Sequence, residues 1–101
     1  MSNRLDLQAI LEVILGSRNV YYQPPNSIKM VYPAIVYELD EIDQKFADNI
    51  TYAKERGYLL TLIHKNPDND LIDTILGLPK CKFVRHFTKD NLHHYIFKIY
   101  Y

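Results

Sequence analysis

The chain has 101 residues, of which 48% are hydrophobic and 24% are charged. This length supports one hydrophobic core and this composition is that of an ordinary globular protein, so we expect a single domain over residues 1–101 and neither a disordered nor a disulfide-dense chain. Twelve Lys and Arg residues balance twelve Asp and Glu residues. Because there is no overall basic field, we expect no sequence-specific nucleic-acid partner.

Three further features bear on the compartment of the protein. The longest apolar runs, LLTLI and YPAIVY, are far shorter than a membrane span. The N-terminal residues MSNRLDLQ lack a signal-peptide pattern, and the single cysteine, Cys81, cannot form an internal disulfide. These features predict a protein of the reducing cytoplasm with no membrane partner.

The N-terminal segment predicts the clearest helix, over residues 3–15. Its apolar residues recur with the spacing of one helical face, at Leu7, Ile10, Leu11 and Ile14. Asp6 suits the first turn of a helix, and Gly16 suits the left-handed position that ends many helices.

Three extended segments follow this helix. Residues 19–23 are rich in β-forming residues and end at two prolines, and residues 32–42 and 56–65 form longer apolar runs. Between the last two runs lies a polar stretch, residues 40–57, which is longer than an ordinary hairpin loop. We expect this stretch to be a polar loop that projects from the domain as an arm.

A second helix is predicted within residues 66–79, where Gly77 and Pro79 would end it. Asn66 can cap its N-terminus and Pro67 fits the first helical position, where the missing N–H is not needed. The buried stripe of this helix would consist of Leu71, Ile72, Ile75 and Leu76.

Residues 82–88 and 92–101 predict the last two strands, joined by a hairpin turn at TKDN, residues 88–91. The element order is therefore α-β-β-β-α-β-β. Strands in consecutive runs with one helix between them are typical of an α+β domain. We expect a mainly antiparallel sheet of about five strands with both helices packed on one face.

Four carboxylates lie close together where the second strand meets the arm: Glu38, Asp40, Glu41 and Asp43. On a regular strand alternate side chains point to opposite faces, so Glu38 and Asp40 would lie on one face and Glu41 and Asp43 on the other. The glycine that a calcium loop requires is missing. We interpret the acids as a solvated strand end or a protein contact surface, with an adventitious cation site and a catalytic site as the alternatives.

The other candidates for chemistry are the histidines and Cys81. His93 and His94 are adjacent on a strand and point to opposite faces, so they cannot both bind one ion, whereas His86 could oppose either across the hairpin. A His and carboxylate metal centre, or Cys81 acting as a nucleophile with His86 as its base, defines the enzymatic alternative. The three glycines stand singly and do not form a phosphate or dinucleotide loop. The sequence predicts no cofactor and no enzymatic activity.

The last strand carries large residues on both faces. One face has Tyr95, Phe97, Ile99 and Tyr101, and the other has Ile96, Lys98 and Tyr100. A small domain has one core, so the second face is expected to meet either a covering helix of the same chain or a neighbouring subunit. Nine tyrosines and no tryptophan suit half-buried sheet faces and subunit interfaces.

With these elements in place, the chain resembles a group of small structural proteins of long-tailed phages and prophages: tail terminator, tail-completion and minor capsid proteins that join head and tail. The resemblance covers nearly the whole chain after Ser17. It lies in the order of four segments: VYYQPPNSIKMVYPAIVYELDEID, FADNITYAKERGYLLTLI, NPDNDLIDTILGLP and VRHFTKDNLHHYIFKIYY.

The resemblance implies a small α+β protein that is assembled in the host cytoplasm and forms a hexameric ring in the neck of the virion, at the head-proximal end of the tail. Its partners would be further copies of itself, the tail tube protein and the head connector or stopper protein. It would bind them without a cofactor and without chemical reaction. A head-completion or stopper role is the near alternative.

A ring of this kind needs two complementary patches on each subunit, because its head-to-tail contact is heterologous. The arm and an edge strand are expected to supply these patches. The expected contact residues lie in the arm and at its return, where acidic and basic residues alternate: Asp40, Glu41, Asp43, Asp48, Asn49, Lys54, Glu55 and Arg56.

Overall fold

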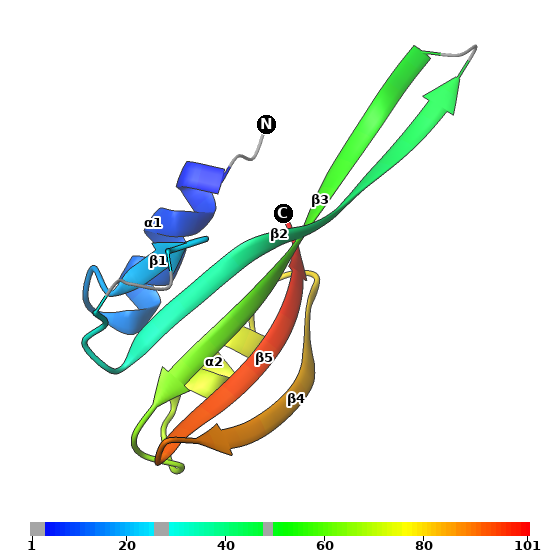
Figure 1. The fold of residues 1–101 in the computed structure, drawn as a ribbon. Coiled ribbons are helices and arrows are strands. Elements are labelled where there is room, and N and C mark those ends of the chain that lie inside the picture. The colour runs from blue at the N-terminus through cyan, green and yellow to red at the C-terminus, as the bar shows by residue number, and fades with distance from the viewer. Residues whose placement is uncertain (1–3, 26–28, 48–49) are drawn as a thin grey trace.

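Helices and strands follow the predicted order in the structure, a computed structural model that describes residues 4–25, 29–47 and 50–101, except for the side chains of residues 43–55 (Figure 1). The helices are α1, Arg4–Leu15, and α2, Leu71–Leu76. The strands are β1, Val20–Tyr22; β2, Ala34–Ala47; β3, Ile50–His64; β4, Cys81–Lys89; and β5, Leu92–Tyr100. The predicted α+β class and element order are confirmed.

The five strands form one mixed sheet in the order β1-β2-β3-β5-β4. Only β1 and β2 are parallel, and the other three pairs are antiparallel. Strands β4 and β5 are joined by a tight turn at Asp90 and Asn91, whose φ angles of 53° and 62° are left-handed. Asp and Asn adopt this conformation more readily than other non-glycine residues, which is why the tetrad at residues 88–91 forms the predicted hairpin turn.

The first strand of the sheet is short because the chain turns away after Tyr22. Gln23 has a left-handed φ of 44°, and two prolines follow it. The backbone N–H of Gln23 donates to the carbonyl of Tyr37 at 3.0 Å, and the N–H of Leu39 donates to the side-chain oxygen of Gln23 at 3.2 Å. The side chain of Gln23 thus adds one hydrogen bond to the β1–β2 ladder, beyond the point where the β1 backbone turns away from β2. Beyond this point β2 has no described partner strand on its β1 side.

Strands β2 and β3 continue well beyond the rest of the sheet as a two-stranded ribbon, which we define as residues 40–47 and 50–56 (Figure 1). The pairing of β2 with β3 continues to Ala47 and Ile50, with register shifts after Leu39 and after Lys45, whereas the ladder between β3 and β5 ends at Gly57. The expected arm therefore projects, but its prediction as a polar loop is wrong. Backbone hydrogen bonds between the two strands satisfy their polar groups without a core beneath them, so the stretch lacks the apolar alternation that marks strands in sequence.

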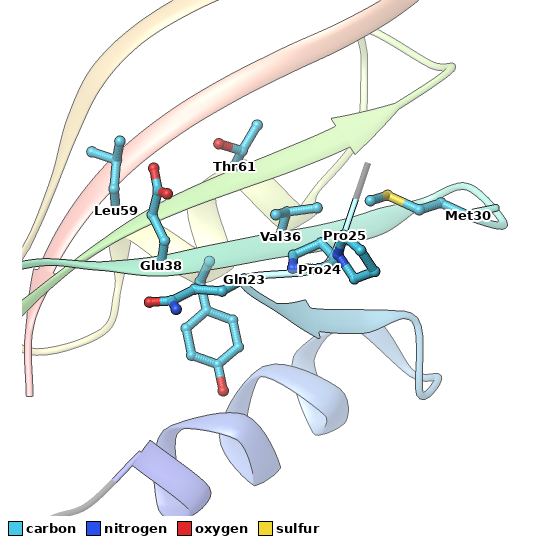
Figure 2. Close-up of a pocket in the computed structure, with 9 residues that line it drawn as sticks. Gln23, Pro24, Pro25, Met30, Val36, Glu38, Leu59 and Thr61 are labelled. Carbon is cyan, nitrogen blue, oxygen red and sulfur yellow. The ribbon is translucent and has the colours of Figure 1, made fainter. Parts of the chain in front are cut away.

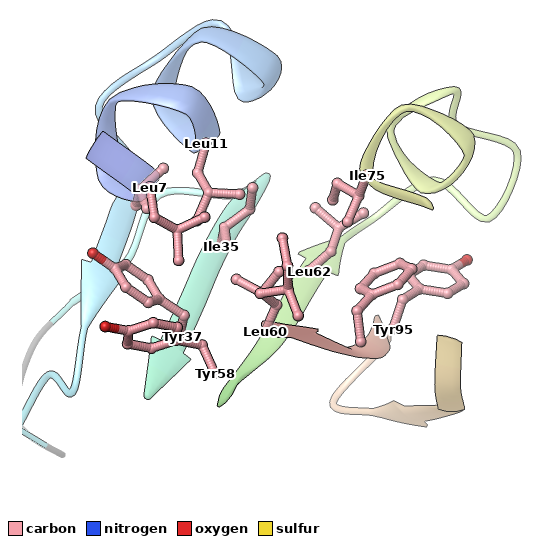
Figure 3. Close-up of a cluster of buried hydrophobic side chains, with 12 residues drawn as sticks. Leu7, Leu11, Ile35, Tyr37, Tyr58, Leu60, Leu62, Ile75 and Tyr95 are labelled. Carbon is pink, nitrogen blue, oxygen red and sulfur yellow. The ribbon is translucent and has the colours of Figure 1, made fainter. Parts of the chain in front are cut away.

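The two faces of the sheet differ in what covers them. Both helices lie on one face, which holds the core, and no described helix lies on the other, which we call the open face (Figures 2 and 3). Val36, Glu38, Leu59 and Thr61 point to the open face, away from α1 (Figure 2). The prediction that β5 carries large residues on both faces is confirmed, since consecutive residues from Tyr95 to Ile99 are buried. The alternative of a covering helix for its second face is wrong for the described part of the chain.

The core lies between the sheet and the helices (Figure 3). Leu7 and Leu11 of α1 and Ile75 of α2 are fully buried against the strands, as the helical spacing predicts. Their partners on the strands are Ile35, Tyr37, Tyr58, Leu60, Leu62, Tyr95, Phe97 and Ile99. Gly16, with a left-handed φ of 77°, ends α1 as predicted.

Two tyrosines in this core show how the tyrosine-rich sequence is used. Tyr37 and Tyr58 are buried, with ring centroids 6.0 Å apart in an edge-on arrangement. The hydroxyl of Tyr37 donates to the side-chain oxygen of Gln8 at 2.5 Å and accepts from the guanidinium of Arg4 at 3.2 Å. Burial raises the pKa of Tyr37, so this hydroxyl remains protonated. The rings supply apolar contact while α1 satisfies the polar end of Tyr37.

The second helix is much shorter than predicted. It spans Leu71–Leu76, so it ends before Gly77 as predicted but begins later than predicted. The side-chain oxygen of Asn66 accepts from the backbone N–H of Asp68 at 3.0 Å, which closes a turn instead of opening a helix. Local hydrogen bonding by Asn66 thus replaces its predicted capping role, and the helix begins five residues later.

Candidate functional site

The base of the ribbon departs from regular strand geometry at Asp40. Leu39 opposes Tyr58 and Glu41 opposes Gly57, so Asp40 is an extra residue on β2, a β-bulge. A bulge shifts the alternation of side chains by one position. The predicted division of the acids between two faces is therefore wrong, because Asp40 and Glu41 both reach the open face.

Both of these acids contact one lysine, Lys98 of β5. The ammonium of Lys98 pairs with the carboxylate of Asp40 and lies 3.3 Å from Oε1 of Glu41. The Lys98 side chain is only 10% exposed, and those of Asp40 and Glu41 are 45% and 44% exposed. The hydroxyl of Tyr100 donates to Oε1 of Glu41 at 2.5 Å. These four residues form what we call the lysine cluster.

Space for the lysine cluster depends on Gly57 of β3. A Cβ atom at this position would lie 2.8 Å from Cγ of Glu41 and 2.8 Å from Cε of Lys98, closer than van der Waals contact permits. The absence of a side chain at Gly57 therefore lets the lysine reach across β3 from β5 to β2.

Charges in the lysine cluster stabilise one another. Hydrogen bonds from Tyr100 and Lys98 lower the pKa of Glu41. Burial alone would lower the pKa of Lys98, but its hydrogen bonds and attraction to Asp40 and Glu41 outweigh burial and raise it. These shifts favour the negatively charged form of Glu41 and the positively charged form of Lys98 at neutral pH. The ammonium of Lys98 therefore lies beside Asp40 and Glu41, two of the carboxylates that the sequence analysis considered as an adventitious cation site.

A cavity of about 340 Å³ lies next to the lysine cluster on the open face (Figure 2). Strands β2 and β3 form its floor, and the connection between β1 and β2 forms one wall. The residues that line it are apolar and polar: Gln23, Pro24, Pro25, Met30, Val36, Tyr37, Glu38, Leu59 and Thr61. A cavity of this size can accept a side chain or a short segment of another protein.

The predicted contact residues lie in different places. Asp40 and Glu41 belong to the lysine cluster; they lie within β2 and not at its end, and their side chains remain 45% and 44% exposed. Arg56 is exposed at the base of the ribbon, opposite Ile42. Along the ribbon Asp43 opposes Glu55, and Lys54 opposes Gln44. Asp48 and Asn49 lie outside the described residues.

The histidines gather at the end of the sheet remote from the ribbon. As predicted, His93 and His94 lie on opposite faces, since His93 opposes His64 and His94 opposes Ile63. Nε2 of His86 and Nδ1 of His93 are 3.4 Å apart. Burial and the neighbouring His93 lower the pKa of His64. No group of three or more His, Cys, Asp or Glu side chains among the described residues is arranged to hold a metal ion.

Cys81 and His86 do not form a pair. Cys81 opposes Ile99 and His86 opposes Tyr95, four ladder positions further along β5, a separation of roughly 13 Å at the rise of a strand. Burial raises the pKa of the Cys81 thiol, and a thiol with a raised pKa is a poor nucleophile. The described geometry therefore offers no support for the cysteine-based alternative.

Three residues of the site were not singled out from sequence: Gly57, Lys98 and Tyr100. Lys98 and Tyr100 were placed on the second face of the last strand, but their partners depend on the strand order β2-β3-β5. A lysine in the middle of an apolar strand was the available signal, because a buried ammonium requires a charged partner.

A comparison with protein-family models found no match, and a comparison with curated protein sequences found none either. Among the described residues, no helix has the length and apolar character needed to cross a membrane.

Proposed function

We propose that this protein is a structural subunit of a phage tail, a tail terminator or tail-completion protein that assembles into a ring, caps the tail tube and joins it to the head connector. The observation that carries the proposal is the ribbon, residues 40–47 and 50–56, which extends beyond the packed sheet. The sequence resemblance points to the same class of protein.

The ribbon supports a role in assembly because it has no packed layer of its own at the end of the sheet. Beyond Arg56, whose carbonyl accepts from the backbone N–H of Tyr101 at 2.9 Å, its strands pair only with each other among the described residues. An isolated two-stranded ribbon is at best marginally stable in water, and its free edges can pair with another chain. A projecting ribbon that is retained in a small domain therefore fits a contact with a partner.

The open face supports the same role. It combines the cavity lined by Val36 and Leu59 with exposed charged groups such as Glu38. Apolar centres with charged rims are typical of contact surfaces between subunits. Binding at such a face requires no chemical reaction, and the proposal assigns none.

A shortened ribbon tests this proposal. Ile42 and Arg56 oppose each other in register, so replacing residues 43–55 by Asn-Gly closes the hairpin with a two-residue turn. We expect the shortened protein to keep the thermal stability of the core and to lose ring formation, measured by sedimentation velocity and electron microscopy. The natural protein at the same concentration is the control.

A second measurement tests the terminator role. Polymerisation of the tail tube protein of the same phage should yield tubes of limited length with the natural protein and longer tubes with the shortened one. If the natural protein neither forms rings nor limits tube length, the proposal is wrong.

A further inference from the structure

The two outer edges of the sheet carry opposite charge. At one edge, β4 holds Lys82, Arg85 and Lys89, all exposed, and no carboxylate. At the other edge, the base of β2 holds three carboxylates, those of the exposed Glu38 and of Asp40 and Glu41, against two cations on the neighbouring strands, Lys98 and Arg56. A chain with no net charge overall is thus basic at one side of its sheet and acidic at the other.

Both edges are also open to backbone pairing. β4 is the outer strand of the sheet and pairs only with β5 among the described strands. On its β1 side, β2 has no described partner strand after Tyr37, and the Gln23 side chain takes the one position that follows. An unpaired strand edge is a template for a further strand.

Exposed apolar side chains accompany both edges. Phe83 and Val84 of β4 are 45% and 47% exposed, and Ile42 of β2 is 49% exposed. Exposed edge strands usually avoid large apolar side chains, because these promote pairing with another chain. Their presence at both edges favours burial on association.

We infer that a second copy of this chain covers these edges: β4 of one subunit pairs with the outer edge of β2, at the base of the ribbon, in the next subunit. The contact is heterologous, since a basic edge meets an acidic edge, and repetition of such a contact closes a ring if the rotation permits it. The inference rests on the proposed ring and names the surfaces that form it.

A charge exchange tests this pairing. Arg85→Glu makes the β4 edge less basic, and Glu38→Arg makes the β2 edge less acidic, so each variant alone should assemble at least about tenfold more weakly than the natural protein. Mixed in equal amounts, the two variants restore both opposite-charge contacts and should assemble nearly as well as the natural protein. The readout is the concentration dependence of mass in sedimentation velocity.

Two controls accompany the exchange. Arg18→Glu changes the same charge at an exposed site before β1, beyond the end of the β1–β2 pairing that is remote from Glu38, and should leave assembly unchanged. Hydrogen exchange of the natural protein should show new protection of β4 amides as the protein assembles, and unchanged α1 amides. Circular dichroism verifies that each variant is folded, and the exchange data test the pairing even if one variant does not fold.

The outcomes separate this inference from the proposed function. If the natural protein forms rings but Arg85→Glu forms them equally well, or the mixture fails to recover, the edge pairing is wrong and the ring proposal stands. If β4 amides gain no protection in the ring, the pairing is wrong again. If the natural protein forms no ring at all, both are overturned.

Discussion

The packed part of the sheet and the ribbon use the same two strands in different ways. In the packed part, β2 and β3 lie under the helices, and residues such as Leu60 and Leu62 are fully buried. Beyond Arg56, the last residue of β3 that accepts a backbone hydrogen bond from the C-terminal residues, the same strands pair only with each other among the described residues. The stability of the packed part therefore comes from burial of apolar surface, whereas the ribbon depends on backbone hydrogen bonds and on the lysine cluster at its base.

The largest effect is expected in the packed part. Leu11→Ala removes a fully buried side chain of α1, and should lower the free energy of unfolding by about 2–5 kcal/mol, measured by urea denaturation. Val13→Ala on the same helix truncates a side chain that is 81% exposed. This substitution should change the free energy of unfolding by less than about 0.5 kcal/mol. Equal effects of the two would contradict the described core.

A smaller effect is expected where the two regions meet. Gly57→Ala places a Cβ atom against Glu41 and Lys98. Because both contacts are to flexible side chains that can move, we expect a loss of about 1 kcal/mol. Gly77→Ala is the matched control, since its nearest neighbour would be 3.4 Å away. A neutral Gly57→Ala would show that the lysine cluster is looser than described.

Lys98→Met tests the charges of the lysine cluster. Methionine retains the apolar contacts of the lysine stem but removes the ammonium, so stability at neutral pH should change by roughly 1 kcal/mol or less. The pKa of Glu41 should rise, because the variant loses one of the two hydrogen bonds that lower it and leaves Asp40 as a nearby negative charge. Carbon-detected NMR titration of the Glu41 carboxyl group measures this shift, and an unchanged pKa would contradict the cluster.

The contribution of the lysine cluster to the pH dependence of stability follows from the shifted pKa values of Glu41 and Lys98. The pKa of Glu41 is lowered from its ordinary value of 4.5 in the folded state, so its contribution is complete above that value and is lost as the pH falls through the folded-state pKa. The pKa of Lys98 is raised from 10.5, so its contribution is complete below that value and is lost as the pH rises through the folded-state pKa. Lys98→Met should weaken the acid-side dependence and remove the contribution of Lys98 to the alkaline one, while the raised pKa of the buried Tyr37 preserves part of the alkaline dependence.

The smallest effect requires no substitution. In the unassembled protein, amides of the ribbon should exchange with solvent through local opening, and amides of Leu60 and Leu62 only through global unfolding. Hydrogen exchange measured by NMR at several low denaturant concentrations distinguishes the two, because only global unfolding depends steeply on denaturant. Equal protection in both regions of the monomer would show that the ribbon is stabilised within the chain.

Sequence reasoning succeeded where one local pattern determines the structure. The helical spacing of Leu7 and Leu11 predicts the buried face of α1, and the turn residues Asp90 and Asn91 predict the last hairpin. Both depend on interactions within a few residues of the chain. The strand count and the α+β class follow from the same kind of signal.

Sequence reasoning failed where the structure depends on pairing between segments that are distant in the chain. The bulge at Asp40 has no Gly or Pro to mark it, and it alone decides that Asp40 and Glu41 share Lys98. The ribbon lacks apolar alternation because no core lies beneath it, so residues 40–57 read as a loop. The charges of β4 and β2 become opposite edges only once the strand order is known.

The turn at Gln23 also limits how far the sheet can be completed from within the chain. Had β1 continued past Tyr22, its backbone would run along β2 toward the ribbon and occupy that edge. The two prolines after Gln23 have no N–H to donate, so a longer β1 could not form without replacing them. Lengthening β1 by substitution of these prolines should therefore make the monomer more stable and the assembly weaker. Because β1 ends at Tyr22, the edge of β2 beyond Tyr37 stays available for the proposed pairing with a second copy of the chain.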